Sequence, residues 1–150
     1  PNWRRLPDLL AESDIVSLHL PLTEQTRRLL DAAALARMKP GAVLVNTSRG
    51  EIVDEDALVG ALTSGRLAAA GLDVFAVEPV PADHPLLRLD NVVLSPHVTW
   101  YTVDTMRRYL ARAIDNCRRL AEGRPLADVV NPVAPGNPVD VSRDPSEGRM

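Results

Sequence analysis

Four short and almost wholly apolar runs are the feature that most limits what this chain can fold into. Runs this solidly hydrophobic are typical of parallel strands buried on both faces, and not of half-exposed antiparallel strands. Helical patterns separate the runs, so the alternation predicts an open α/β fold with helices packed against a parallel sheet. The four predicted strands are Ile15–Leu20, Ala42–Asn46, Ala68–Val74 and Asn91–Ser95.

The predicted helices carry residues that favour their starts and ends. Asp31 and Asp54 are placed as N-caps, since a short acidic side chain can accept a hydrogen bond from an unpaired amide of the first turn. The first helix is expected to run through Met38, and Gly65 is expected to end the second in a left-handed conformation. A longer amphipathic helix is expected from Thr102 to Glu122, because its apolar residues recur at helical spacing.

Composition and charge exclude several classes of function. The net charge of -3 leaves no basic surface of the kind that a phosphate backbone requires, so we expect no nucleic-acid partner. No apolar run approaches the roughly 20 residues of a membrane span, and no signal-peptide pattern is present. We therefore expect a cytoplasmic protein with no membrane partner. Because Cys117 is the single cysteine, we expect neither an internal disulfide nor a cysteine-based metal cluster, and we assign no residue to a metal.

Polar side chains lie at the carboxyl ends of the predicted strands or shortly after them. They include His19, Arg49, Asp73, Glu78 and His97. In an open parallel sheet, ligands bind beyond the carboxyl ends of the strands, which meet at one edge. We therefore expect an arginine, a carboxylate and a histidine to come together at this edge.

The residues around the second predicted strand carry a resemblance to a known family. Met38 to Asp54, with the sequence MKPGAVLVNTSRGEIVD, resembles the signature of the D-isomer-specific 2-hydroxyacid dehydrogenases. The resemblance continues through SDIVSLHLPLT, GLDVFAVEP and SPHVTW, and covers residues 3–131 in the family's order. It implies a Rossmann-like fold, NAD or NADP as cofactor, a small 2-oxo or 2-hydroxy acid as substrate, and a catalytic trio at Arg49, Glu78 and His97.

The chemistry of these three side chains suits hydride transfer to a carbonyl group. A proton must move onto or off the carbonyl oxygen, and His97 is the candidate acid/base because histidine titrates nearest neutrality. Glu78 against the other ring nitrogen would fix the tautomer and favour the imidazolium form. The guanidinium fork of Arg49 would hold the substrate carboxylate, which a lysine could not do as well. Two alternatives stay open: Arg49 and Glu78 could form structural ion pairs, and His19 and His84 compete with His97 as the proton carrier.

The resemblance also assigns residues to the cofactor. Leu20, Pro21, Thr47 and Asp73 resemble positions that line it, and the counterpart of Asp73 accepts a hydrogen bond from the nicotinamide carboxamide. Asp73 could alternatively serve only as a cap or ion-pair partner near the end of its strand. The position that reads the ribose has no counterpart in this sequence, so the choice between NAD and NADP stays open.

Part of the family's pattern is missing. The eight glycines include no G-x-G-x-x-G turn of the kind that holds a pyrophosphate at a helix N-terminus. We therefore interpret residues 1–131 as the second half of a dinucleotide-binding domain, a partial Rossmann-like sheet lacking the first half of the fold, with a return helix at 102–122. Residues 132–150 are expected to be a disordered tail. Such a partial domain is expected to expose apolar strands, to bind cofactor weakly and to be inactive by itself.

The leading hypothesis is an NAD(P)-dependent oxidoreductase that interconverts a 2-oxo acid and a D-2-hydroxy acid. Two alternatives are a cofactor-sensing, corepressor-like binding protein and an inactive truncated remnant. Which acid is used stays open. The full-length protein is expected to be a homodimer, as is common in the family.

Overall fold

The structure is a computed structural model that describes residues 2–129. The chain divides between Thr102 and Val103 into two compact units, each of which is described by itself. The tail predicted at 132–150 lies outside the described residues. The assignment of residues 1–131 to one partial domain stays a prediction.

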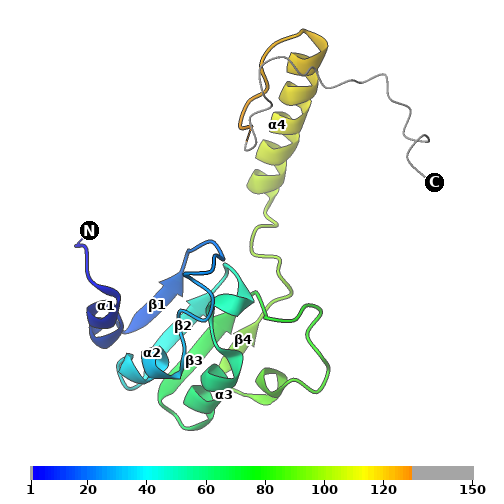
Figure 1. The fold of residues 1–150 in the computed structure, drawn as a ribbon. Coiled ribbons are helices and arrows are strands. Elements are labelled where there is room, and N and C mark those ends of the chain that lie inside the picture. Colours follow the sequence, from blue (N-terminus) through cyan, green and yellow to red (C-terminus); the bar gives the residue numbers. More distant parts are fainter. Residues whose placement is uncertain (1, 130–150) are drawn as a thin grey trace, which may run out of the picture. The chain divides into compact units, whose positions relative to one another are not determined.

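The first unit is built on a parallel four-stranded sheet with the order β1-β2-β3-β4 (Figure 1). The strands are β1 (Ile15–Leu18), β2 (Ala42–Asn46), β3 (Leu67–Leu72) and β4 (Val92–Leu94). The predicted open α/β fold is thereby confirmed. However, β1 ends two residues before the predicted Leu20, because the Leu18 carbonyl accepts the hydroxyl of Ser48 at 2.7 Å instead of continuing the strand ladder.

One helix precedes the first strand, and two helices and two short 3-10 helices lie between the strands. They are α1 (Leu6–Glu12), α2 (Ala32–Arg37), α3 (Glu55–Thr63), η1 (Gly50–Ile52) and η2 (Pro85–Arg88). Both predicted caps are confirmed, since Asp31 accepts from the Ala34 amide at 2.8 Å and Asp54 from the Ala57 amide at 3.3 Å. Gly65 ends α3 with φ +72°, as predicted. Helix α1 was not predicted, because its seven residues are too few to show a helical period.

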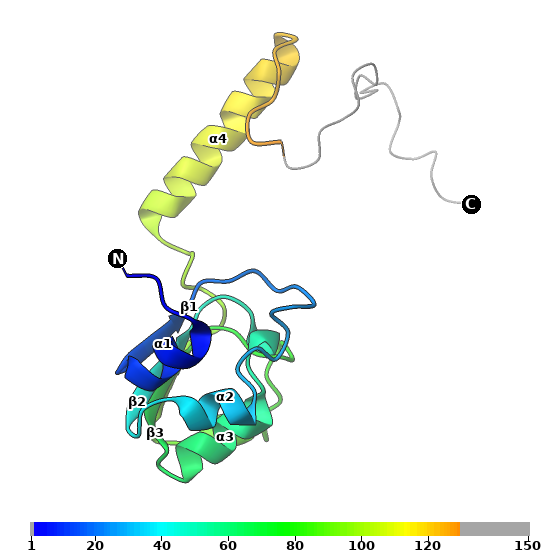
Figure 2. The ribbon, with the colours of Figure 1, turned by 60° about the vertical axis from the view of Figure 1, so that its left-hand side comes forward.

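The two faces of the sheet differ in how well they are covered. Helices α2 and α3 lie on one face (Figure 2), and their leucines join a single core with Val16, Leu44 and Leu72. On the opposite face no helix of residues 2–102 covers the strands, and Ile15 and Val93 are 65% and 76% exposed. Parallel sheets are normally covered on both faces, so within residues 2–102 this sheet has one face without a helix layer.

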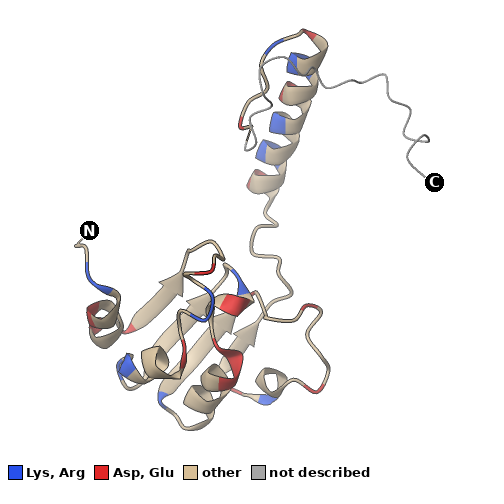
Figure 3. Ribbon diagram, in the orientation of Figure 1, with Lys and Arg blue, Asp and Glu red and all other residues tan. Residues whose placement is uncertain are grey.

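The second unit contains the long helix α4 (Val103–Ala121), close to the predicted bounds. Acidic and basic residues recur along it (Figure 3), and Arg119 donates to Asp115 one turn earlier at 2.7 Å. The helix is followed by Gly123, at φ +66°, and the chain then folds back so that the Ala127 amide donates to the Asn116 side chain at 2.9 Å. Across the described residues, no helix combines the length and apolarity needed to cross a membrane.

Candidate active site

The strand register aligns the residues on which the site is built. Leu18 pairs with Asn46, Asn46 with Leu72, and Leu72 with Leu94, so the four strands end in one row. The loops that follow β2, β3 and β4 line an open cavity of about 290 Å³. Its lining includes all three residues of the predicted trio: Arg49, Glu78 and His97. The predicted convergence at one edge of the sheet is therefore present.

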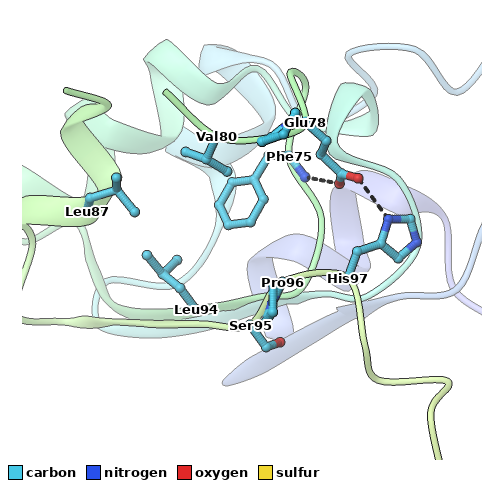
Figure 4. Close-up of a pocket in the computed structure, with 9 residues that line it drawn as sticks. Phe75, Glu78, Val80, Leu87, Leu94, Ser95, Pro96 and His97 are labelled. Atoms are coloured by element: carbon cyan, nitrogen blue, oxygen red, sulfur yellow. Dashed lines mark hydrogen bonds and ion pairs between the residues drawn. The ribbon is translucent and has the colours of Figure 1, made fainter. Parts of the chain in front are cut away.

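The imidazole of His97 pairs with the carboxylate of Glu78 (Figure 4). Nδ1 of His97 lies 2.9 Å from Oε2 of Glu78, and Oε1 of Glu78 accepts from the Phe75 amide at 3.0 Å. The hydrogen bonds from His97 and from Phe75 keep the pKa of Glu78 below its ordinary value. An ionised Glu78 requires the proton on Nδ1 of His97, which leaves Nε2 free to exchange a proton with a ligand. With 39% and 35% of their side chains exposed, His97 and Glu78 are both within reach of a ligand.

The backbone of His97 has an unusual conformation. Its φ is +55°, in the left-handed region that non-glycine residues rarely adopt. The His97 amide donates to the Asp73 carbonyl at 2.8 Å, which holds the residue against the end of β3. Strained backbone of this kind is kept only where the surroundings enforce it, and it is typical of functional positions.

A buried asparagine organises the turn that carries Arg49. Asn46, the last residue of β2, accepts from the Ser48 amide at 3.0 Å and donates to the Arg49 carbonyl at 2.9 Å. Among the described residues, the guanidinium itself donates to one acceptor, the neighbouring Ser48 carbonyl, at 2.6 Å. Within residues 2–129 no carboxylate forms an ion pair with Arg49, so its charge is available to an anionic ligand.

Asp73 is 1% exposed, and both of its carboxylate oxygens are engaged by the loop that holds His97. Oδ1 accepts from the Ser95 hydroxyl at 2.5 Å and the Val98 amide at 2.9 Å, while Oδ2 accepts from the Thr99 amide at 3.0 Å and hydroxyl at 2.7 Å. Burial by itself raises the pKa of Asp73, but these hydrogen bonds outweigh it and lower the pKa to about 2. The contacts make Asp73 an anchor of the loop, and its cofactor role stays a prediction.

We expect Asp73→Asn to destabilise the protein by about 1–3 kcal/mol at neutral pH, because an amide nitrogen would face donors that now meet a carboxylate oxygen. Since the folded-state pKa of Asp73 lies below the ordinary 3.8, its ionisation stabilises the fold above that pH. This contribution is lost as the pH falls from the ordinary value toward about 2. Urea unfolding at several pH values should therefore show the gap between wild type and variant closing in acid. A gap independent of pH would contradict the assignment.

The residues predicted to contact the cofactor differ in how accessible they are to a ligand. Leu20 and Pro21 line a second cavity of about 490 Å³, which also contains Arg49, and its size lies within the range of small-molecule sites. Thr47 is half-buried and does not line this cavity, and Asp73 is almost inaccessible. The accessible part of the predicted cofactor contact is therefore the segment beyond β1.

The competing histidines have other neighbours. His19 also lines the second cavity, where its Nε2 lies 2.9 Å from the hydroxyl of Ser17. His84 faces Glu55, with 3.4 Å between Nε2 and Oε2. Neither histidine lines the cavity that holds Arg49 and Glu78. Of the three, only His97 is paired with a carboxylate there.

A larger, mostly apolar cavity of about 630 Å³ adjoins the paired histidine and glutamate (Figure 4). Phe75, Val80, Leu87 and Leu94 form its wall. In the described part of the chain, no group of three or more histidine, cysteine, aspartate or glutamate side chains is arranged to hold a metal ion.

Three polar residues that hold the site in place were not predicted to do so from the sequence. Asn46, Ser95 and Thr99 contact the loops that carry Arg49 and His97. One signal was available for Asn46, because an asparagine at the end of an apolar strand is buried and must find hydrogen-bond partners. No such signal exists for the serine and the threonine.

Comparison with known proteins shows where the chain belongs. Residues 1–99 match the family model described as D-isomer specific 2-hydroxyacid dehydrogenase, NAD binding domain. A glyoxylate reductase of Aeropyrum pernix is 50% identical over 130 residues, which are 87% of this chain and 39% of that protein. The chain spans about 40% of the length of the curated relatives it matches.

Solved structures agree with the family match. A D-isomer specific 2-hydroxyacid dehydrogenase from Xanthobacter autotrophicus Py2, in complex with NADPH and MES, is 44% identical with a TM-score of 0.72; the match covers 84% of this chain and 51% of that one. A D-lactate dehydrogenase with NAD+ from Lactobacillus jensenii is 34% identical with a TM-score of 0.79, over 86% and 43% of the two chains. With residues 1–99 matched by the family model, the chain belongs to the D-isomer-specific 2-hydroxyacid dehydrogenase family.

Proposed function

We propose that the protein to which these residues belong is an NAD(P)-dependent oxidoreductase that interconverts a 2-oxo acid and a D-2-hydroxy acid. The observation that carries the proposal is the cavity in which the paired Glu78 and His97 meet an arginine that has no carboxylate partner among residues 2–129. An acid/base and a fixed positive charge side by side are what a ligand with a carbonyl group next to a carboxylate requires.

Each side chain has one task in this scheme. Arg49 binds the substrate carboxylate and orients the neighbouring carbonyl group. In the reducing direction, Nε2 of His97 donates a proton to the carbonyl oxygen, and in the oxidising direction it removes the proton from the hydroxyl. Glu78 holds Nδ1–H and stabilises the imidazolium form. The nicotinamide, when bound, supplies or accepts the hydride at the substrate carbon.

The cofactor would lie beyond β1, where Leu20 and Pro21 line the second cavity beside Arg49. The residues of this cavity are better placed than Asp73 to contact the nicotinamide end of a dinucleotide. The Asp73 carboxylate is buried, and both of its oxygens already accept hydrogen bonds. Relatives are known with NADPH and with NAD+, so both cofactors belong in the test. A cytoplasmic location and a homodimer are parts of the same proposal.

The proposal is tested by steady-state assays of the protein as expressed from its gene. We expect oxidation of NADH or NADPH that depends on an added 2-oxo acid, with glyoxylate and hydroxypyruvate in the panel because the similar proteins carry these names. A chiral product should have the D configuration. Cofactor binding without turnover would contradict the enzyme and favour a cofactor sensor. The absence of both binding and turnover would favour an inactive remnant.

A further inference from the structure

One side chain of α3 contacts both ends of the loop that carries Glu78. The amide of Ala76, at the start of this loop, donates to Oε1 of Glu55 at 2.7 Å. At its end, Nε2 of His84 lies 3.4 Å from Oε2 of the same carboxylate. Oε1 of Glu55 therefore holds the start of the loop 76–84 to the first turn of α3, while Oε2 lies close to the ring of His84 at the end of the loop.

The neighbours of His84 determine which ring nitrogen carries the proton. The Leu86 amide donates to Nδ1 of His84 at 3.3 Å, so Nδ1 is the acceptor and a neutral ring carries its proton on Nε2, facing Glu55. The side chains of His84 and Glu55 are only 19% and 16% exposed. Sheltered contacts of this kind compete less with water than ion pairs on an open surface.

The contact at Ala76 leads directly to the candidate catalytic pair. Ala76 follows Phe75, whose amide donates to Oε1 of Glu78, and Oε2 of Glu78 pairs with His97. Glu55 thus fixes the amide next to the one that orients Glu78. A shift of this peptide would move the Glu78 carboxylate relative to the imidazole.

The same peptide also touches the turn that carries Arg49. A Cβ added at Gly50 would lie 1.9 Å from the carbonyl carbon of Phe75 and 2.3 Å from the nitrogen of Ala76. Only a glycine permits this approach. The peptide between Phe75 and Ala76 is therefore held from two sides, by the backbone at Gly50 and by the carboxylate of Glu55.

We propose that Glu55 is a positioning residue: by holding the Ala76 amide at the start of the loop 76–84, it keeps the Glu78 carboxylate aligned with the imidazole of His97. The expected effect on turnover rests on the proposed function. The alignment itself can be measured without turnover.

A simpler interpretation is that Glu55 only supplies negative charge to the N-terminus of α3. Asp56 provides the matched control, because it lies in the same first turn and is exposed. If charge at the helix terminus were the whole role, Glu55→Ala and Asp56→Ala would behave alike. If Glu55 positions the loop, only Glu55→Ala changes the pair of Glu78 and His97.

The experiment uses ¹⁵N NMR of the histidine rings in the full-length gene product, with the His97 signals assigned by their loss in His97→Asn. In the wild type and in Asp56→Ala we expect the His97 proton on Nδ1, where Glu78 accepts it. In Glu55→Ala we expect a mixture of tautomers. Glu55→Gln keeps an oxygen for the Ala76 amide but turns an amide group toward Nε2–H of His84, so we expect it to lie between Asp56→Ala and Glu55→Ala.

Turnover provides the second readout. In Glu55→Ala we expect kcat to fall by up to about a hundredfold and KM to change much less, because the turn of Arg49 is held by its hydrogen bonds with Asn46 and not by Glu55. A change of tautomer in a protein without dehydrogenase activity would support the positioning role and contradict the proposed function alone. Ring spectra of Glu55→Gln and Glu55→Ala that match Asp56→Ala would overturn the positioning role. If Glu55→Ala does not fold, the spectrum of Glu55→Gln decides by the same criterion.

Discussion

Replacement of His97 by asparagine is expected to lower kcat of the full-length protein by about 10²–10⁴, the range for loss of a general acid/base. Asparagine is the substitution of choice because it tolerates a positive φ better than most residues, and His97 has φ +55°. Alanine would add backbone strain to the loss of the imidazole. The effect of His97→Asn is therefore chemical, and cofactor affinity should be largely retained.

Stopped-flow measurement of the hydride-transfer step separates this loss from slow product release. His19→Asn is the informative comparison, because His19 lines the cavity beside Leu20 and competes for the role of proton carrier. A loss below about tenfold in His97→Asn, together with a larger loss in His19→Asn, would move the acid/base role to His19.

Gly50→Ala is expected to be among the most damaging single substitutions outside the trio. The added Cβ would lie 1.9 Å from a backbone carbon of Phe75, a separation that no side-chain rotation can relieve. The loop at Phe75 and Ala76 or the turn at Arg49 must move, and overpacking of this kind typically costs about 1–3 kcal/mol. Because both segments line the cavity that contains Arg49, Glu78 and His97, we also expect activity to be lost in the molecules that remain folded.

The matched control is Gly60→Ala, in the interior of α3. A Cβ at Gly60 meets no atom within 4 Å, and alanine is the better helix former by about 0.5–1 kcal/mol. Thermal unfolding should therefore show a lower Tm for Gly50→Ala and an equal or higher Tm for Gly60→Ala. Equal Tm values for the two variants would show that the close approach at Gly50 is not required.

The sheet and the ends of its helices could be predicted because their signals are local. Four apolar runs define the strands, and single residues such as Asp31, Asp54 and Gly65 mark helix ends through contacts with their own neighbours. The convergence of the candidate trio followed from the rule that parallel strands end at one edge. A local pattern of this kind was absent for α1, whose seven residues bury only Leu10.

The support of the site could not be predicted because its contacts are long-range. The hydrogen bond from Ala76 to Glu55 spans 21 residues, and that from Thr99 to Asp73 spans 26. A glutamate at the start of a helix is explained locally by the helix dipole, so nothing in the sequence suggests a second role. The left-handed conformation of His97 likewise depends on the amide contact to Asp73, which exists only in the folded chain.

The loop after β4, which Asp73 anchors, links the register of β4 to the position of His97. β4 has only three residues and pairs on one side, with Leu94 opposite Leu72. A slip by one residue would reverse which side chains of β4 face the helices, and it would bring either Leu94 or Pro96 to the place of Ser95 beside Asp73. Neither residue has a hydroxyl, so a desolvated carboxylate would lose a donor, at about 1–3 kcal/mol. The contact between Ser95 and Asp73 therefore favours both the correct register of β4 and the placement of His97 beside Glu78.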